Sequence, residues 1–520
     1  MTQAPRDATD ALSRARIEQL FRTNSRLIVT TRIVTACLSL VMIPILVSRL
    51  GVAGYGTWEA LLALASLSSV FQFALSGTLV WRVSDAYGRG DNAEIRRVGR
   101  LGAAACLTLF LVLWPLAWLL REPAVMFLNV APESRAIASL MFPVLAALIL
   151  LGGLSETLEA IVSGCQRTGL VNVVGAAAQM LNYTAVIIVA LLGGGLWSLV
   201  AGQGTGFLVR QVGAWMAVRA SFGSVSLLPL LPQARDLALF RYSGWLTVSG
   251  VAAALRDQTD KIVLSSLASP AWVGYYGMAS RLAGLVLEVL RPLYSPMLTA
   301  AGALRAMNDW DGVRSLYSRG MFIVSILTGT ALVGVAGLVD RLVVFWIGEA
   351  IPEVRVLLWL LITGTATAAI LTGTGTAISR GCGQPAIEAT YLALNLVLNL
   401  VFTIALVLLI GPVGTAVATG LTWALSSILF LFVLHKRMDL PVEASREAAG
   451  AALLAGATAA IVYWTSSSLG LPDGRQEALA SLALLGTAGT LLYFGLLASF
   501  GLLSVRRVYG GLRFLLGGAG

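Results

Sequence analysis

Residues 386–410 read AIEATYLALNLVLNLVFTIALVLLI, and residues 412–435 read PVGTAVATGLTWALSSILFLFVLH. Each run is long enough to cross the hydrocarbon core of a bilayer, which takes about 20 apolar residues. In lipid the backbone polar groups must be satisfied within the segment itself, so we read both runs as helices. Only Gly411 separates them, and a helical hairpin inside a membrane is therefore predicted.

The rest of the chain has the same character. Of its 520 residues, 57% are hydrophobic and only 12% are charged, and the mean hydropathy is +0.83. An ordinary globular domain is about 25% charged, so a water-soluble chain of this size would lack the polar residues to cover its surface. We predict a polytopic membrane protein without a large extramembrane catalytic domain, because no polar stretch is long enough to form one.

Apolar runs separated by charged breaks predict an all-α fold of about fourteen transmembrane helices. The helices are expected near 26–48, 53–81, 100–121, 136–162, 172–193, 196–218, 241–268, 272–304, 319–347, 353–379, 386–410, 412–435, 447–468 and 477–504. The connections between them are short.

Basic residues indicate the orientation, because loops that stay in the cytoplasm retain Lys and Arg. They crowd into both tails and the even-numbered loops, whereas the odd-numbered loops carry few of them. Both termini are therefore expected in the cytoplasm. This topology also accounts for the net charge of +10, so we expect no nucleic-acid partner.

An internal repeat divides the chain. Gly54-Tyr55-Gly56 opens the second helix as Gly274-Tyr275-Tyr276 opens the eighth, and Asn182 and Asn399 lie at matching places in the fifth and eleventh. Six helices thus repeat as six helices of like orientation, as in many transporters. The expected parts are a cytoplasmic tail (1–25), an N-terminal six-helix lobe (26–219), a cytoplasmic linker (220–240), a C-terminal six-helix lobe (241–440), and two additional helices with a basic tail (441–520). The two lobes are expected around a central cavity.

The residues for common catalytic chemistry are scarce. The four cysteines, Cys37, Cys106, Cys165 and Cys382, lie in or beside apolar segments, and His435 is the single histidine. This set predicts neither a disulfide framework nor a metal cluster. We expect a transporter and not an enzyme, with no catalytic residues, no metal and no cofactor.

Six basic residues fall inside the expected helices: Arg32, Arg210, Arg256, Lys261, Arg281 and Arg291. A cation at the centre of a membrane helix costs about 2.5–3.5 kcal/mol. These side chains must therefore face a wet cavity, pair with acids, or extend to the membrane interface. For Arg210 the interface is the favoured reading, and for Arg32 it is the alternative to a role in a cavity.

Spacing sorts the remaining charges. In the seventh helix Arg256 and Asp260, and likewise Asp257 and Lys261, are four residues apart and can pair along one face, so a purely structural ion-pair group is one reading. In the eighth helix Arg281, Glu288 and Arg291 share one sector, which leaves one positive charge in excess. Arg32 and the Arg281 to Arg291 strip are therefore the best candidates for an unpaired functional charge.

These residues carry a family resemblance. The stretch from Arg49-Leu50-Gly51 through Gly54-Tyr55-Gly56 to Gly88-Arg89-Gly90-Asp91, and then Gln258-Thr259-Asp260-Lys261 with Gly274-Tyr275-Tyr276, resembles bacterial polysaccharide or O-antigen flippases. These belong to the multidrug/oligosaccharidyl-lipid/polysaccharide exporter superfamily. The resemblance covers about residues 20–440.

The resemblance implies a flippase of the bacterial inner membrane that carries a polyprenyl-pyrophosphate-linked saccharide outward by alternating access, for surface polysaccharide synthesis. Implied partners are the bilayer, the lipid-linked glycan and a glycan polymerase or glycosyltransferases, with the chain itself a monomer. Substrate binding is expected at Arg32, Arg256, Lys261, Arg281 and Arg291, and ion coupling at Asp257, Asp260 or Glu288.

Charge chemistry favours the same substrate. Arginine offers a planar fork of donors for phosphate, and moving negative charge outward gains about 2.3 kcal/mol per charge per 100 mV. The main rival is a multidrug cation exporter of the same superfamily, which would need an acid in a cavity helix. A membrane glycosyltransferase would need catalytic groups on a sizeable outer loop, and the outer loops are short.

Overall fold

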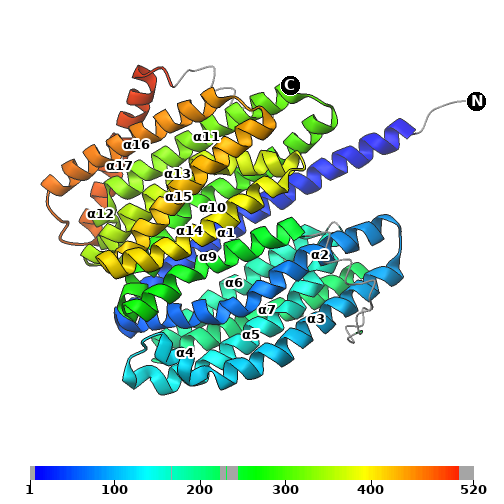
Figure 1. Cartoon of the computed structure of the whole chain (residues 1–520), viewed down its shortest axis with the longest axis horizontal. Coiled ribbons are helices and arrows are strands. Elements are labelled where there is room, and N and C mark those ends of the chain that lie inside the picture. The colour runs from blue at the N-terminus through cyan, green and yellow to red at the C-terminus, as the bar shows by residue number, and fades with distance from the viewer. Residues whose placement is uncertain (1–5, 166, 223–229, 231–243, 503–520) are drawn as a thin grey trace, which may run out of the picture. The chain divides into compact units, whose positions relative to one another are not determined.

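The computed structural model describes residues 6–165, 167–222, 230 and 244–502, and every regular element in these ranges is a helix (Figure 1). The all-α class is therefore confirmed. The first elements are α1 (Arg6–Ser66), the 3-10 turn η1 (Leu67–Ser69), α2 (Val70–Gly88), α3 (Asn92–Leu119), α4 (Arg121–Phe127), α5 (Pro132–Gly164), α6 (Thr168–Leu191) and α7 (Trp197–Phe222). They are followed by α9 (Gly244–Leu267), α10 (Pro270–Ala306), α11 (Trp310–Gly337), α12 (Val339–Ile347), α13 (Pro352–Gly381), α14 (Pro385–Ile410), α15 (Gly414–Met438), α16 (Val442–Ser468) and α17 (Arg475–Ser499).

Ten helical stretches of the described chain have the length and hydropathy to cross a membrane, where the sequence predicts fourteen. One of them, Val34–Ser69, joins the first expected helix to most of the second. The helices α7, α9 and α10 lie at three further expected positions, but the charges inside them lower their hydropathy. The polytopic membrane class is thus confirmed, while α4 and α12 are short helices that the apolar pattern does not reveal.

Gly51 interrupts the first of these stretches. Its backbone adopts φ 70° and ψ 168°, outside the helical region, and glycine reaches a positive φ without steric cost. The expected second helix, 53–81, is not continuous either, because it breaks at η1. There the hydroxyls of Ser66, Ser68 and Ser69 donate to carbonyls three or four residues earlier, and such bonds compete with the helical ladder and bend it.

The described helices separate into two compact units. Unit 1 comprises residues 1–49, 75–119 and 140–242, and the apolar side chains of α2, α3, α5 and α7 form its core. Its buried members include Val83, Ile95, Val98, Leu158, Ile161 and Val218. The expected linker, 220–240, lies almost wholly outside the described residues, as does the end of the basic tail after residue 502.

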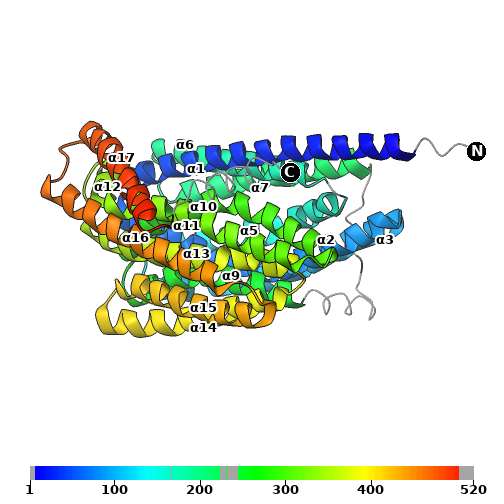
Figure 2. The ribbon, with the colours of Figure 1, turned by 90° about the horizontal axis from the view of Figure 1, so that it is seen from above.

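Unit 2 comprises residues 50–74, 120–139 and 243–520. Within it α10 packs against α13, α11 against α16, and α14 against both α15 and α9, so these helices run side by side in Figures 1 and 2. Its core includes Met297, Tyr317, Met321, Ile378 and Leu434. The hydrophobic free energy of about 25 cal/mol per Å² arises only when apolar surface is removed from water. Helices that pack together in a bilayer are removed from lipid instead, so close packing is the main stabilising term.

Two segments that precede the second repeat in sequence belong to unit 2. One is 50–74, and the other is 120–139, which holds α4 and the beginning of α5. Hydrogen bonds fix the second segment to the end of α9: Ser265 Oγ donates to the Leu128 carbonyl at 2.6 Å, and Asn129 Nδ2 donates to the Ser266 carbonyl at 2.7 Å. The boundary between the structural units therefore differs from the boundary between the sequence repeats, because residues 50–74 and 120–139 of the first repeat belong to unit 2.

The repeat itself recurs in the contacts. A Cβ on Gly164 would lie 3.1 Å from the Ser84 nitrogen in unit 1, and one on Gly381 would lie 2.9 Å from Ala301 Cβ in unit 2. Both members of the second pair follow their counterparts by 217 residues. Equivalent helices thus approach each other closely at equivalent glycines.

The asparagines inside the fifth and eleventh expected helices repeat in the same way. In unit 1 a Cβ on Gly202 would lie 3.0 Å from Asn182 Oδ1. In unit 2 Asn399 Nδ2 donates to Thr419 Oγ1 at 3.4 Å. Residue 419 follows residue 202, and residue 399 follows residue 182, by the same 217 positions, so each asparagine joins the corresponding pair of helices.

Two arginines link the short helix α12 to the last two helices. The buried Arg341 donates to Ser466 Oγ at 2.7 Å and to the Gly470 carbonyl at 3.0 Å, which caps the end of α16. Arg475 donates to the Ile347 carbonyl at 3.0 Å at the start of α17. Cations placed on helix C-terminal carbonyls satisfy groups that the helix itself leaves unpaired.

Candidate functional site

Lys261 and Glu59 form the shortest ion pair between α9 and the part of α1 that follows Gly51. Lys261 Nζ lies 2.6 Å from Glu59 Oε2, and Tyr55 donates to Glu59 Oε1 at 2.8 Å. Arg281 on α10 adds a favourable electrostatic interaction with the same carboxylate. Glu59 therefore binds one of the predicted substrate-binding cations, Lys261, and interacts electrostatically with a second, Arg281.

The predicted pairs along α9 are wrong. Arg256 does not bridge to Asp260 but to its neighbour Asp257, with Arg256 Nη2 2.5 Å from Asp257 Oδ1. Its guanidinium also lies over the ring of Trp423 on α15, 4.5 Å from the centroid. Spacing of four residues permits a pair, but Glu59 and Trp423 on other helices compete successfully for Lys261 and Arg256.

Asp260 is a buried carboxylate held by hydroxyl groups. Tyr276 on α10 donates to Oδ2 at 2.5 Å, Thr419 on α15 donates to Oδ2 at 2.8 Å, and Thr403 on α14 donates to Oδ1 at 3.1 Å. Among the described residues no cation lies within ion-pair distance of it. Oxygen atoms from three helices so arranged can bind a proton or a hard cation.

Both arginines that the sequence marks on α10 interact with acids, so the prediction that one of them is unpaired is wrong, although the count of one positive charge in excess on Arg281, Glu288 and Arg291 holds. Arg291 Nη1 lies 2.8 Å from Glu288 Oε1, and Arg281 interacts with Glu59. Arg32 falls within α1, but its side chain lies outside the described residues. Of the predicted ion-coupling acids, Glu288 and Asp257 are therefore beside arginines, and only Asp260 is held by neutral groups.

A cavity of about 470 Å³ opens in unit 2 between α10, α13, α14 and α15, and we call it the unit 2 cavity. Its polar and aromatic lining consists of Arg291, Tyr294, Thr365, Thr372, Thr376, Arg380, Glu388, Tyr391 and Trp423. Arg291 and Arg380 are the exposed members of this lining. Of these residues only Arg291 is marked by its sequence context, as a cation inside an expected membrane helix.

An ion pair closes one wall of the unit 2 cavity. Arg380 at the end of α13 binds Glu388 on α14 through two guanidinium nitrogens, and its Nη2 lies 2.7 Å from Glu388 Oε1. Glu388 is buried, whereas 41% of the Arg380 side chain is exposed. Side-on pairs of this kind fix both groups and orient the remaining donors and acceptors.

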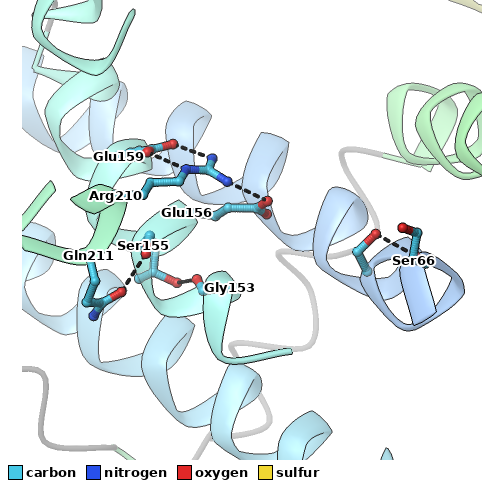
Figure 3. Close-up of polar contacts among 9 residues, drawn as sticks. Ser66, Gly153, Ser155, Glu156, Glu159, Arg210 and Gln211 are labelled. Atoms are coloured by element: carbon cyan, nitrogen blue, oxygen red, sulfur yellow. Dashed lines mark hydrogen bonds and ion pairs between the residues drawn. The ribbon is translucent and has the colours of Figure 1, made fainter. Parts of the chain in front are cut away.

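Unit 1 holds a separate charged cluster (Figure 3). Arg210 on α7 binds Glu159 on α5 through two bonds of 2.7 and 2.6 Å, and its Nη1 lies 3.8 Å from Glu156 Oε1. Beside it Ser155 donates to Gln211 Oε1 at 2.5 Å. Arg210 is thus paired with two acids of the neighbouring helix, and its predicted place at the membrane interface stays a prediction.

Acids inside apolar helices were the missed signal in both units. Glu59, Glu156 and Glu159 lie in stretches as apolar as those that hold the intramembrane cations. The desolvation argument that marks an arginine inside the membrane marks a glutamate equally. Applied to acidic as well as basic residues, the desolvation argument predicts that these glutamates pair with cations on other helices.

Comparison with known proteins identifies relatives of the chain. A model of the polysaccharide biosynthesis protein family matches residues 21–301. The probable low-salt glycan biosynthesis flippase Agl15 of Haloferax volcanii is 24% identical over 263 residues, which are 49% of this chain and 54% of that protein. The chain thus matches about half the length of this relative. The probable flippase AglR of the same organism is 21% identical over 431 residues, 81% of this chain and 84% of that one.

Solved structures share the fold. The lipid II flippase MurJ in an inward closed conformation matches with a TM-score of 0.73 at 14% identity, over 92% of this chain and 100% of that one. An inward-facing multidrug resistance transporter of the MATE family, in the MOP superfamily, matches with a TM-score of 0.62 at 14% identity, over 79% and 98%. Because one is a flippase and the other a drug transporter, the fold alone does not select between these activities.

Proposed function

The chain belongs to the polysaccharide biosynthesis protein family, and from this we propose that it is a flippase. The proposed substrate is a polyprenyl-pyrophosphate-linked saccharide, which moves from the cytoplasmic to the outer leaflet during surface polysaccharide synthesis. The observation that supports it best is the ion pair of Lys261 with Glu59, to whose carboxylate Arg281 adds a further electrostatic interaction. A lipid pyrophosphate carries about two negative charges, which such a cluster can attract.

Arg256, Arg291 and Arg32 complete the proposed set of basic residues. Arg256 is fixed by Asp257 and Trp423, and Arg291 is exposed at the unit 2 cavity. Guanidinium groups that already have one partner retain further donors, since each carries five N–H groups. They can therefore bind phosphate without the cost of an isolated cation in lipid.

Transport is proposed to follow alternating access. The Glu59–Lys261 pair joins a segment of the first repeat to a helix of the second within unit 2. If this pair separates during the transport cycle, phosphate oxygens can replace Glu59 at Lys261. Under the orientation given by the basic loops, both termini face the cytoplasm, and the protein works as a monomer with a polymerase or glycosyltransferases nearby.

Asp260 is the proposed coupling acid. It is the buried one of the three predicted acids, and its hydroxyl partners come from three helices. A proton or hard cation bound there would change the packing of these helices. The membrane potential adds about 2.3 kcal/mol per negative charge per 100 mV in the outward direction.

Reconstituted protein tests the proposal. Proteoliposomes that contain a polyprenyl-pyrophosphate-linked saccharide in one leaflet should show transfer of the labelled sugar to the other leaflet. Arg281→Gln should abolish transfer, whereas Arg437→Gln, at an exposed position near the end of α15, should leave it intact. Transfer at the wild-type rate in Arg281→Gln would refute the proposed site, and no transfer by the wild-type protein would refute the function.

A multidrug cation exporter is the second candidate, and one observation favours it: Asp260 is a buried carboxylate held by neutral groups. A cationic drug could bind to such a group. Dye efflux from cells that express the protein would distinguish the two functions. Efflux that disappears in Asp260→Asn, together with absent sugar transfer, would establish the exporter.

A further inference from the structure

We infer that the unit 2 cavity is a saccharide subsite, which receives a sugar residue of the transported molecule. The inference rests on the proposed function and adds to it a place for the sugar, whose lining shares only Arg291 with the basic residues proposed for the pyrophosphate. Its volume of about 470 Å³ lies within the ~300–1,000 Å³ that is usual for small-molecule sites.

The walls suit a sugar ring, which has C–H faces and hydroxyl edges. Trp423, Tyr294 and Tyr391 supply aromatic surface in the lining. Trp423 is held in place by the guanidinium of Arg256, 4.5 Å from its ring centroid, and by Tyr391, 6.4 Å from it. Rigid aromatic rings provide contact area at a small cost in side-chain entropy.

Two buried hydroxyls of the lining have no satisfactory partner. The hydroxyls of Tyr294 and Tyr391 are inaccessible to water, and neither makes a hydrogen bond of ordinary geometry with the described residues. Tyr391 itself is 5% exposed, and its hydroxyl lies beside Thr372 and Ser427. Buried polar groups are nearly always paired in native proteins, so these two indicate a ligand that brings its own donors and acceptors.

Threonines add further oxygen atoms to the same wall. Thr372 donates to the Ala368 carbonyl at 2.7 Å, and Thr376 donates to the Gly373 carbonyl at 2.9 Å. Each hydroxyl thereby uses its proton within its own helix and keeps lone pairs as acceptors. Tyrosine donors and threonine acceptors thus belong to the residues around the cavity, which is the combination that sugar hydroxyls require.

The charges of the lining favour a neutral ligand over a phosphate. Arg291 is paired with Glu288, and Arg380 with the buried Glu388. A dianionic phosphate inside the cavity would meet the Glu388 carboxylate and be repelled. A sugar hydroxyl can donate to Glu388 and accept from Arg380, and it needs no net charge.

Binding measurements on the full-length protein in lipid nanodiscs test this inference. One probe is the free saccharide released by mild acid from the lipid-linked intermediate that accumulates in a strain lacking the gene. The other is undecaprenyl pyrophosphate, which carries no sugar. Tyr391→Phe and Tyr294→Phe remove the unpaired hydroxyls, and they should not harm folding because no ordinary hydrogen bond is lost.

We expect the wild-type protein to bind both probes. Each tyrosine variant should weaken saccharide binding about fivefold to tenfold and leave undecaprenyl pyrophosphate binding within about twofold. The control Tyr493→Phe also removes a hydroxyl from a buried tyrosine outside the cavity, one that donates to the Ala451 carbonyl at 3.3 Å, and this variant should bind both probes as the wild type does. Arg281→Gln should weaken only the pyrophosphate probe.

The outcomes separate the inference from the function on which it rests. If undecaprenyl pyrophosphate binds but the saccharide does not, or if both tyrosine variants bind the saccharide normally, the subsite is refuted and the flippase stands. If an equal loss for both probes follows each tyrosine substitution, the subsite is also refuted. If no lipid-linked saccharide accumulates in the deletion strain and neither undecaprenyl pyrophosphate nor any saccharide binds, the proposed function itself falls.

Discussion

Gly56 in α1 and Gly274 in α10 lie backbone against backbone. A Cβ on Gly56 would be 1.6 Å from the Pro270 carbonyl oxygen and 2.8 Å from the Gly274 nitrogen, and one on Gly274 would be 2.5 Å from the Val52 carbonyl oxygen. Both glycines belong to the Gly-Tyr motifs that begin equivalent helices of the repeat. The motif therefore serves close helix contact, as small residues do in membrane helices generally.

Substitution of Gly274 by alanine should destabilise the protein. The added methyl group meets backbone atoms that cannot rotate away, and overpacking of this kind costs about 1–3 kcal/mol. Gly284→Ala is the control in the same helix, because nothing lies within 4 Å of its Cβ position. Thermal unfolding in detergent should show a lower midpoint for Gly274→Ala only; equal midpoints would contradict the close contact.

Substitution of Glu59 should lower the stability of the protein more than substitution of an exposed acid. Glu59→Gln leaves Lys261 without its partner at 2.6 Å, where only 12% and 20% of the two side chains are exposed, and loss of one member of a largely buried pair costs about 3–5 kcal/mol as an upper range. Asp311→Asn, at a side chain that is 94% exposed, should cost less than about 1 kcal/mol. Unfolding midpoints of both variants measure the difference, and a similar loss in both would count against a structural ion pair.

Asp260→Asn should uncouple transport from an ion gradient. The amide keeps the size of the carboxylate but has no charge to bind a proton or cation. Stimulation of sugar transfer by a proton or sodium gradient should fall by the roughly 5- to 150-fold that is typical of coupling between sites. Asp257→Asn, at a 59% exposed side chain, should retain the stimulation; if Asp260→Asn retains it as well, the coupling site lies elsewhere.

The two glutamates beside Arg210 should differ in their contribution. Glu159→Gln breaks a bidentate pair with bonds of 2.7 and 2.6 Å, while Glu156→Gln breaks a contact of 3.8 Å. Charge-assisted bidentate bonds are the stronger kind, so we expect a loss of about 2 kcal/mol for Glu159→Gln and less than about 1 kcal/mol for Glu156→Gln. Denaturation curves of the two variants should show this order, and the reverse order would contradict it.

Cys165 should be slow to react with maleimide. It lies between α5 and α6, and burial raises the pKa of its thiol to about 11, so less thiolate is present at neutral pH and its fraction rises about tenfold per pH unit until that pKa. The reference is the same thiol in detergent-denatured protein. Mass spectrometry after brief labelling at pH 7.5 should find Cys165 modified much less in the folded protein than in the denatured protein, and equal labelling of the two would contradict the prediction.

The sequence predicts the positions of the helices well, but it does not predict which charged residues pair between helices. Runs such as 386–410 determine their own conformation, because lipid offers no other partner for the backbone, and the structure has a helix there. Lys261 and Glu59 are 202 residues apart, and nothing local selects that pair over Asp257. The choice depends on which helices pack together, which a single sequence does not reveal.

The unit 2 cavity was beyond prediction for a related reason. Tyr294, Arg380, Tyr391 and Trp423 come from four helices, and each is an ordinary residue within its own segment. Arg291 was noticed because a cation inside a membrane helix is costly. A neutral aromatic residue carries no such mark, so a site made mainly of neutral groups leaves little trace in composition or spacing.

The break in α1 has a mechanical consequence. Residues up to 49 belong to unit 1 and residues 50–74 to unit 2, so the chain crosses between the units beside Gly51, whose φ is 70° and around which no atom lies within 4 Å of a Cβ position. Glycine reaches this positive φ without steric cost, whereas a residue with a side chain does not. A bulkier residue at position 51 would therefore strain the backbone at this break without a clash against neighbouring atoms and without touching either polar cluster.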